Sequence, residues 1–569
     1  MTQDGEQLSS GKSKVEHLKE TSNALRGTVG PELARDSDRF TEDDSVILKH
    51  HGIYQQDDRD DRARARQEGR EKTYFSMVRC KIPGGILTRD QYLALDDIAT
   101  RHGNNTLRLT TRQDIQFHAV FKRHLKRTIQ EINEALVTTL GACGDVERNL
   151  MACPAPLPDR ARTRIQEYAR RLSDQLLPRT KAYHEIWLKG EKIVSSEQPD
   201  EEPLYGRAYL PRKFKSGLAF PGDNCIDVYS QDIGMVPVMA GETLEGFVVL
   251  AGGGLGMTHG KVETFPRLAD PIAFVAPDEL VRTVETIITI QRDHGDRQNR
   301  RHARMKYLLH EWGVERFRAE MEHRLGRALQ PPRPLRWEKV EDHLGWHRQA
   351  DGRWFLGVWV ENGRIKDGRE VRWKAGFRQL LERFPFGVRL TPQQNILFTD
   401  IGDHQPPVVE GILRDHQVAF ADQLPNALRY SMACPALPTC GLALAEAERA
   451  LPPLVRQLEA ILSELGLAEE KLSIRMAGCP NGCSRPYIGD IGFVGRTLNK
   501  YQIYLGGDFT GTRLNQLYAD MVPLDRLADA LKPLLVFYRD HRTPGEGFGD
   551  FCHRVGRDTL KAIGTVSGA

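Results

Sequence analysis

Short segments with the hydrophobic period of strands alternate along the chain with longer segments that have the period of helices. Apolar and polar residues alternate in "TLRLTTRQDIQFHAV" at 106–120 and in "VRLTPQQNILFTDI" at 388–401. Apolar residues recur every three or four positions in "RTRIQEYARRLSDQLL" at 162–177 and in "PLVRQLEAILSEL" at 453–465. These periods indicate strands and helices respectively, so the sequence predicts mixed α/β layers.

An internal repeat relates the two halves of the chain. "LRLTTRQDIQF" begins at 107 and "VRLTPQQNILF" at 388, while "MACPA" begins at 151 and again at 432, so both pairs are separated by 281 residues. Two different motifs with one offset indicate a duplicated module of that length. We therefore predict two related halves around a pseudo-twofold axis. A long charged helix at 301–326 and a proline-rich linker at 329–337 would lie between them.

Composition limits the possible classes of protein. With 569 residues, of which 40% are hydrophobic, the chain can bury a large core divided among about three or four domains. A formal charge of +3 gives little net attraction for a polyanion, so nucleic acid is not an expected partner. The chain begins with a polar segment and has no run of eighteen apolar residues, so we expect a soluble, cytoplasmic protein with no membrane partner.

The spacing of the nine cysteines separates candidate ligands from the others. An odd number of cysteines is typical of a reducing compartment, in which thiols stay free or bind metals. Two close pairs are the expected ligands, Cys434 with Cys440 in "CPALPTC" and Cys479 with Cys483 in "CPNGC". The remaining cysteines lie far apart in the sequence and are not expected to be ligands: Cys80, Cys143, Cys153, Cys225 and Cys552.

Four thiolates suit either a tetrahedral zinc ion or an iron-sulfur cube. Zinc ligands usually lie two to four residues apart, whereas five residues separate Cys434 from Cys440, which favours the cube. Zinc and unliganded buried cysteines remain alternatives. Pro480 and Gly482 oppose a regular helix between the second pair, so a loop around a metal centre is expected there.

Several cations accompany these cysteines. Arg108 and Arg112 lie at an even spacing on one face of a predicted strand, and Lys213 and Lys215 repeat that spacing in "LPRKFKSG". Each cation alone is more typical of a solvated surface charge. Together with Arg79, Arg148 and the glycine-rich "GGGLG" at 252–256, they indicate a site for a strongly anionic ligand. The "GGGLG" segment lacks the spacing of a dinucleotide-binding motif.

The joint pattern of "CPALPTC", "GCPNGC", the duplicated "RLTxxQ" and "HGIYQQDDRD" at 51–60 resembles the family of siroheme and 4Fe-4S sulfite and nitrite reductases. The resemblance covers about 22–551, nearly the whole chain. It implies an α/β (α+β) fold, internally duplicated about a pseudo-twofold axis. The implied units are an N-terminal arm at 1–71, ferredoxin-like half-modules at 72–140 and 346–412, and larger α/β modules for siroheme and cluster at 141–330 and 425–569. The arm, polar and low in aromatic residues, is expected to be partly mobile or to dock a partner.

The resemblance also implies roles for particular residues. Cys434, Cys440, Cys479 and Cys483 would hold a 4Fe-4S cluster, and Cys483 would also bridge it to the siroheme iron. Arg79, Arg148, Lys213 and Lys215 would bind the anion, with the two lysines as proton sources. The residues implied to hold siroheme are Arg108, Arg112, Gln116, His118, Lys306, Asn481 and Cys483. Thr111, Gly441, Arg485 and Pro486 depart from the family's pattern; the last two could affect redox potential or electron entry.

The implied activity is the six-electron reduction of sulfite to sulfide in sulfate assimilation and cysteine biosynthesis. The chain shows no flavin or nicotinamide site of its own, so the resemblance implies a flavoprotein alpha subunit that delivers electrons from NADPH. Three alternatives remain: reduction of nitrite to ammonia, a ferredoxin donor, and a noncatalytic iron-sulfur or zinc protein. The last predicts no heme absorption.

Overall fold

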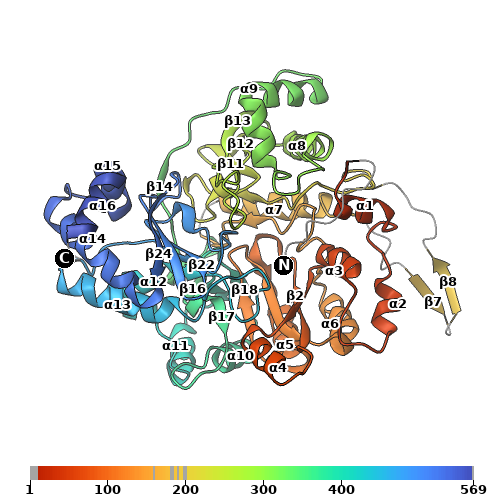
Figure 1. Cartoon of the computed structure of the whole chain (residues 1–569), viewed down its shortest axis with the longest axis horizontal. Coiled ribbons are helices and arrows are strands. Elements are labelled where there is room, and N and C mark those ends of the chain that lie inside the picture. The colour runs from red at the N-terminus through yellow and green to blue at the C-terminus, as the bar shows by residue number, and fades with distance from the viewer. Residues whose placement is uncertain (1–10, 158–159, 180–184, 189–190, 196–201, 567–569) are drawn as a thin grey trace.

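Four five-stranded sheets carry the fold in the computed structural model, which describes residues 11–157, 160–179, 185–188, 191–195 and 202–566 (Figure 1). Two of the sheets form a ferredoxin-like pair with helices α5, α6, α10 and α11, at the bottom of the view. The other two are larger α/β units, whose helices lie at the top and at the left. Both kinds of unit occur once in each half, as the duplicated motifs predicted. None of the helices in these ranges combines the length and apolarity that crossing a bilayer requires.

The two ferredoxin-like sheets exchange a strand. The first has the order β1-β2-β5-β4-β17 and the second has the order β15-β16-β19-β18-β3, so each contains a short strand from the other half. Antiparallel pairing joins Arg364 to Arg108 in the first sheet and Arg389 to Ile86 in the second. The bounds are β1 Ile53–Asp57, β2 Tyr74–Arg79, β3 Ile86–Leu87, β4 Leu107–Leu109, β5 Ile115–Val120, β15 Gly345–Arg348, β16 Trp354–Val358, β17 Arg364–Ile365, β18 Gly387–Leu390 and β19 Ile396–Ile401.

Helices cover these sheets: α5 Arg89–His102, α6 Lys122–Glu134, α10 Trp373–Arg383 and α11 Pro406–Asp415. Helix α5 begins with a capping box, because the Thr88 hydroxyl accepts from the Gln91 amide while the Gln91 side chain accepts from the Thr88 amide. One apolar core joins both ferredoxin-like sheets, with Leu107 and Phe117 from the first half and Val388 and Phe398 from the second. The two half-modules therefore fold around shared hydrophobic contacts.

The larger units repeat one sheet order. In the first, β13-β12-β11-β9-β6, the strands are β6 Met151–Ala152, β9 Ser216–Leu218, β11 Ile233–Ala240, β12 Thr243–Ala251 and β13 Asp270–Val275. In the second, β20-β21-β22-β23-β24, they are β20 Ser431–Ala433, β21 Ile474–Ala477, β22 Ile491–Thr497, β23 Lys500–Leu505 and β24 Gln516–Pro523. Three parallel strands followed by two antiparallel ones occur in both. The sheet order thus repeats along with the motifs.

The helices of these units are α7 Arg160–Gln175, α8 Leu280–His294 and α9 Met305–Leu325 in the first, and α12 Asn426–Arg429, α13 Leu451–Glu464, α14 Leu527–His541, α15 Phe548–Val555 and α16 Arg557–Val566 in the second. Helix α9 lies within the predicted long helix but is interrupted at Gly313, whose φ of 72° and ψ of 166° are not helical. It ends at Gly326, whose φ of 71° is left-handed. Two short sheets, β7 Glu185–Leu188 with β8 Glu191–Ser195 and β10 Gly222–Asp223 with β14 Trp337–Lys339, complete the strands.

The N-terminal segment is helical and attached to the rest of the protein. Helices α1 Lys14–Thr21, α2 Val29–Ala34 and α3 Glu42–Leu48 precede β1, and α4 Arg59–Gln67 follows it. The Lys19 ammonium is fully buried, 2.6 Å from Glu16 and 3.3 Å from Asp145 of the first large unit. Because this ion pair is buried and joins the two segments, residues 14–48 belong to the folded body. The expectation that this segment is partly mobile or docks a partner stays a prediction.

Candidate active site

The four paired cysteines lie at the ends of two neighbouring parallel strands. Cys434 directly follows β20 and Cys479 lies two residues after β21, and the two strands pair in parallel from Ser431 with Ile474. Because the carboxyl ends of parallel strands meet at one sheet edge, both cysteine loops start together. The Gly478 amide donates to the Cys434 sulfur at 3.3 Å. A side chain at Gly478 would place its Cβ 2.5 Å from that of Ala436, so glycine allows this approach.

The burial of the four thiols is unequal. Cys434 and Cys479 are buried, Cys440 is partly buried and Cys483 is exposed. Burial, followed by the charges of the nearby Cys483 and Cys440, raises the pKa of Cys479 to about 12. Cys434 also has a pKa well above its ordinary range, through burial and then through Cys483 and Cys479. These thiols lie close enough to affect one another, and bound cations would favour their thiolate forms.

The separation of the sulfurs distinguishes a cluster from a single zinc ion. Thiolates around one zinc at about 2.3 Å would lie about 3.8 Å from one another. Among the residues that the structure describes, no three of these four cysteines form a group of ligand atoms within 4.8 Å of one another. A cube with iron at four corners needs such wider spacing. Four thiolates on two adjacent loops are the donor set of a 4Fe-4S cluster, whereas a single zinc shared by these cysteines is not supported.

The glycine-rich segment supports the second cysteine loop. Lys306 of α9 is fully buried, and its ammonium donates to the carbonyls of Gly254 at 3.1 Å, Gly256 at 2.8 Å and Phe265. The Met257 amide donates to the Pro480 carbonyl at 2.9 Å, between the two cysteines. Asn481 also belongs to this loop, and its amide nitrogen lies 3.6 Å from the Cys479 sulfur. Lys306 thus fixes the segment that contacts the loop; a role in holding siroheme stays a prediction.

A buried ion triad supports the first cysteine loop. Glu448 accepts from Arg108 at 3.0 Å and from Arg364 at 2.7 and 2.9 Å. Arg108 also donates to the Ala433 carbonyl at 2.8 Å, one residue before Cys434. Burial opposes ionisation of Glu448, but Arg364 and Arg108 outweigh it and lower its pKa to about 2. The Arg108 guanidinium therefore positions the Cys434 strand, and its predicted contact with siroheme is untested.

A group of cations, here called the basic cluster, lies near Cys483: Arg79, Arg148, Arg212, Lys213 and Lys215. The charge of Cys483 acts on Arg79, Lys213 and Lys215, which places all three near the exposed thiol. In the described chain the guanidinium of Arg148 donates only to the Gly144 carbonyl, at 3.2 Å. No salt bridge or side-chain hydrogen bond within those residue ranges engages the ammonium of Lys213 or Lys215. Such uncompensated cations favour the binding of an anion.

Crowding of the cations lowers the pKa of the two lysines. Burial and then the charges of Arg148, Arg304 and Arg212 lower the pKa of Lys213 to about 7. Burial, Arg112 and Lys213 lower the pKa of Lys215 well below its ordinary value. An ammonium with a pKa near neutrality can release its proton readily, whereas a guanidinium keeps its proton. The two lysines are thus suited to donate protons, whereas Arg79 and Arg148 are suited to bind an anion.

Three further predicted siroheme residues lie on or beside β5. Gln116 and His118 are buried, and their side chains lie 3.2 Å apart; with the Gln116 amide turned, its oxygen accepts from Arg79 at 2.9 Å. Burial lowers the pKa of His118 well below its ordinary range, so the ring is neutral. Arg112 is buried and donates to Gln231 at 2.7 Å and Ser216 at 3.2 Å. Their contacts are with protein atoms, and the siroheme roles remain predictions.

The residues that depart from the family's pattern have structural contacts. Thr111 donates to the Cys483 carbonyl at 2.9 Å. Arg485 has a left-handed φ of 58° and points into the protein, where it binds Asp227 and donates to the Thr111 carbonyl at 2.8 Å and the Pro392 carbonyl at 3.0 Å. Its guanidinium therefore joins the two halves beneath the Cys483 loop.

Sequence reasoning missed Tyr54, Cys143 and Arg212. The Tyr54 hydroxyl contacts the Cys143 thiol, and burial, followed by that thiol, raises the pKa of Tyr54 to about 12. Arg79 and Arg148 act on Tyr54 from the basic cluster. Arg212 stands directly before Lys213 in "LPRKFKSG", so its position in the sequence was a signal. Nothing in the spacing of Cys143 indicated its place here.

Four cysteines on two adjacent loops, near cations that have no acidic partner in the described chain, are typical of an iron-sulfur protein with an anion site, and comparison gives the family. The profile described as "Nitrite and sulphite reductase 4Fe-4S domain" matches residues 167–329 and 426–563. The profile described as "Nitrite/Sulfite reductase ferredoxin-like half domain" matches 67–135 and 347–415. The chain belongs to the nitrite and sulfite reductase family. The predicted family and duplicated fold are confirmed, and the predicted siroheme and 4Fe-4S cluster are the cofactors of this family.

Individual relatives extend over nearly the whole chain. The sulfite reductase (ferredoxin) of Synechococcus elongatus is 46% identical over 96% of this chain and 90% of its own. The sulfite reductase (NADPH) hemoprotein beta-component of Staphylococcus haemolyticus is 44% identical over 97% of this chain and 96% of its own. The structure of Mycobacterium tuberculosis NirA protein has the same fold, with a TM-score of 0.78 at 22% identity and 96% coverage of both chains.

Proposed function

We propose that the chain reduces sulfite to sulfide by six electrons. The observation that carries this proposal is the exposed Cys483 thiol, which faces the unpaired cations of the basic cluster while its three partners are more buried. Cys434, Cys440, Cys479 and Cys483 would hold the 4Fe-4S cluster, with Cys483 at the boundary to siroheme. The relatives at 44% and 46% identity both carry the name sulfite reductase, which supports the choice of substrate.

The bound cofactors would supply electrons in succession, as sulfur passes from oxidation state +4 to −2 and three oxygens leave as water. The residues of the chain provide binding and protons. Arg79 and Arg148 neutralise the charge of the anion and keep their own protons. Lys213, with a pKa lowered to about 7 by burial and neighbouring cations, and Lys215 hold protons that can pass to departing oxygens.

Substitution of Lys215 tests this assignment. Lys215→Met should lower sulfite turnover with a small artificial reductant by about 100-fold, the usual contribution of a general acid. Its iron and siroheme content should stay at the wild-type level, because in the described part of the chain no hydrogen bond or ion pair joins the Lys215 ammonium to a cysteine loop. Lys500→Met, at the exposed first residue of β23, is the matched control and should retain full turnover. Full turnover by Lys215→Met would remove its role as proton source.

Parallel assays with nitrite decide the substrate class. We expect a higher kcat/KM with sulfite than with nitrite, measured with the same artificial reductant. The reverse order would replace the proposal by nitrite reduction to ammonia. Absence of heme absorption in the purified, iron-loaded protein would favour a noncatalytic iron-sulfur protein.

We propose a flavoprotein alpha subunit as the source of electrons from NADPH, in the reducing cytoplasm. Relatives of similar identity are named for NADPH and for ferredoxin, so the donor requires its own test. Turnover driven by NADPH and such a flavoprotein should exceed turnover driven by reduced ferredoxin at equal donor concentration. The opposite result would assign a ferredoxin donor and leave sulfite reduction itself unaffected.

A further inference from the structure

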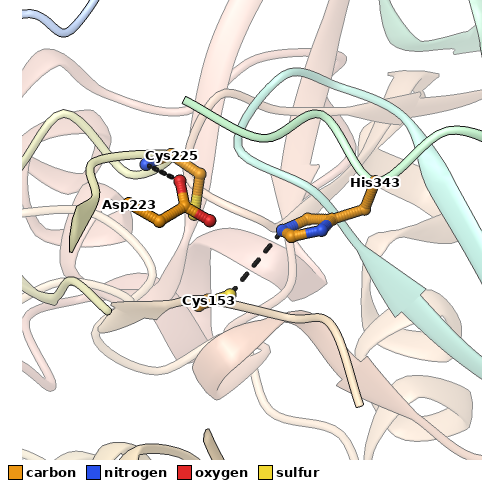
Figure 2. Close-up of side chains that lie close together, drawn as sticks. All are labelled: Cys153, Asp223, Cys225 and His343. Carbon is orange, nitrogen blue, oxygen red and sulfur yellow. Dashed lines mark hydrogen bonds between the residues drawn. The ribbon is translucent and has the colours of Figure 1, made fainter. Parts of the chain in front are cut away.

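A second group of potential ligands lies in the first half, outside the site described above. Cys153, Asp223, Cys225 and His343 offer one ligand atom each, and these atoms all lie within 4.8 Å of one another (Figure 2). All four residues are at most 1% exposed. Cys153 directly follows β6, as Cys434 follows β20 in the duplicated unit. The first half therefore retains a sulfur at the position corresponding to a cluster ligand.

The four residues come from three separate segments. Asp223 ends β10 and Cys225 lies two residues later, whereas His343 belongs to the segment between β14 and β15 that joins the two halves. His343 has a left-handed φ of 59°, which is unfavourable for a residue other than glycine. Its ring nitrogen Nε2 points to the Cys153 sulfur at 3.7 Å. The backbone thus holds the imidazole toward the thiol in a strained conformation.

One carboxylate oxygen of the group has no hydrogen bond. Asp223 Oδ1 accepts from the amides of Cys225 and Glu341, both at 3.1 Å, which fixes the orientation of the carboxylate. Oδ2 has no hydrogen-bond partner although the residue is fully buried, and its nearest cation is Arg162 at 3.7 Å. A buried carboxylate oxygen without a hydrogen bond has lost its contacts with water and gained none in the protein, which destabilises the folded state. A bound cation would offset this destabilisation.

We propose that Cys153, Asp223, Cys225 and His343 bind one Zn²⁺ ion. Zinc accepts sulfur, imidazole and carboxylate ligands together in tetrahedral geometry. The ligand atoms need to close by only about 1 Å to reach the separations of about 3.3–3.8 Å that zinc requires. Four protein ligands and full burial leave no open position, so the ion is structural. Two thiolates and a carboxylate exceed the charge of zinc by one, which Arg162, 2.6 Å from the Cys153 sulfur, offsets.

The ion would fix the joining segment to the first half. The neighbouring Asp342 pairs with Arg429 of the second half, with Arg429 Nη2 at 2.9 Å. A zinc ion on His343 would therefore connect both halves through two adjacent residues. Cys153 and Cys225 lie 72 residues apart in the sequence, so a search for closely spaced ligands would not find this site. The expectation that only the close cysteine pairs are ligands does not hold under this proposal.

Metal analysis of the purified holoenzyme tests the proposal. We expect one zinc per chain in addition to the cluster and siroheme iron. Cys225→Ser and His343→Ala should each lose the zinc and keep the iron, whereas the matched control Cys552→Ser, another buried cysteine, should keep both. Cys479→Ser should keep the zinc and lose cluster iron, which separates this site from zinc misloaded among the cluster cysteines.

A measurement on the wild-type protein tests the proposal even if the variants fail to fold. X-ray absorption at the zinc edge should show two sulfur ligands at about 2.3 Å and two nitrogen or oxygen ligands at about 2.0–2.2 Å. Less than a tenth of a zinc per chain after exposure to Zn²⁺ would overturn the proposal, as would zinc retained in both ligand variants. A disulfide between Cys153 and Cys225 in the native holoenzyme, found by peptide mass analysis without reduction, would also overturn it.

Discussion

Glu448 should contribute strongly to the stability of the site although it binds no cofactor. Its carboxylate is the only acidic partner of both Arg108 and Arg364 in the described chain, and its side chain is 16% exposed. Glu448→Gln keeps the shape but removes the charge, leaving two buried guanidinium groups without compensation. Loss of one partner from a buried ion pair typically costs about 3–5 kcal/mol.

The pKa of Glu448 gives an independent magnitude. A shift from 4.5 to about 2 corresponds to about 3 kcal/mol of native-state stability at neutral pH. Because the folded-state pKa is the lower one, this stability is present above the unfolded value of 4.5 and is lost as pH falls through about 2. The difference between Glu448→Gln and wild type should therefore stay constant from about pH 6 to pH 9.

The rate of cluster loss in a fixed urea concentration, followed by visible absorbance, is the assay. If the whole 3 kcal/mol appears in the unfolding rate, Glu448→Gln loses the cluster about 100-fold faster. The control is Glu464→Gln, since Glu464 and its partner Lys532 at 2.9 Å are both exposed. An exposed pair contributes at most about 1 kcal/mol, or about fivefold. Equal rates for the two variants would refute the reasoning.

Three other substitutions probe separate parts of the protein. Lys213→Arg should flatten the alkaline rise of KM for sulfite above about pH 7, because arginine keeps the proton that Lys213 loses; sulfite's own titration affects both proteins, and identical profiles would contradict this. Lys306→Met, which leaves the Gly254, Gly256 and Phe265 carbonyls without their donor, should lower the siroheme-to-protein ratio; an unchanged ratio would exclude a supporting role. Lys19→Met should destabilise the protein by about 1–3 kcal/mol in urea unfolding, because buried Glu16 and Asp145 lose one cation and keep Arg297 and Arg300 respectively. A change under about 1 kcal/mol would favour a loosely attached N-terminal segment.

The duplicated motifs made the architecture predictable from the sequence, because one offset appears both in the strands and in the turns that follow them. The cysteine pairs were predictable for a similar reason, since both ligands of each pair lie in one loop. Arg108 and Lys306 were predicted as site residues from the resemblance. Their contacts with Glu448 and Gly254 were not predicted, because these partners lie far away in the sequence. Long-range contacts of this kind come from tertiary packing, which no local pattern encodes.

The N-terminal segment also shows that sequence composition does not reveal tertiary contacts. Its polar composition predicted an arm that is mobile or docks a partner, and did not reveal that Lys19 and Glu16 are buried in ion pairs with each other and with distant charges. Composition alone cannot distinguish a solvated charge from one that pairs in the interior. The group of ligands around Cys153 was not predicted from the sequence for an analogous reason. Its members approach one another only after the first half and the joining segment have folded.

The exchange of β3 and β17 between the ferredoxin-like sheets restricts how the two halves can move. Swinging one half away from the other would break the pairing of Arg364 with Arg108 and of Arg389 with Ile86. A motion that opens the whole molecule to admit a reactant would therefore cost the free energy of these strand pairs. Catalysis in this architecture instead suits a rigid frame, in which small anions diffuse in and electrons arrive while the protein scaffold stays in place.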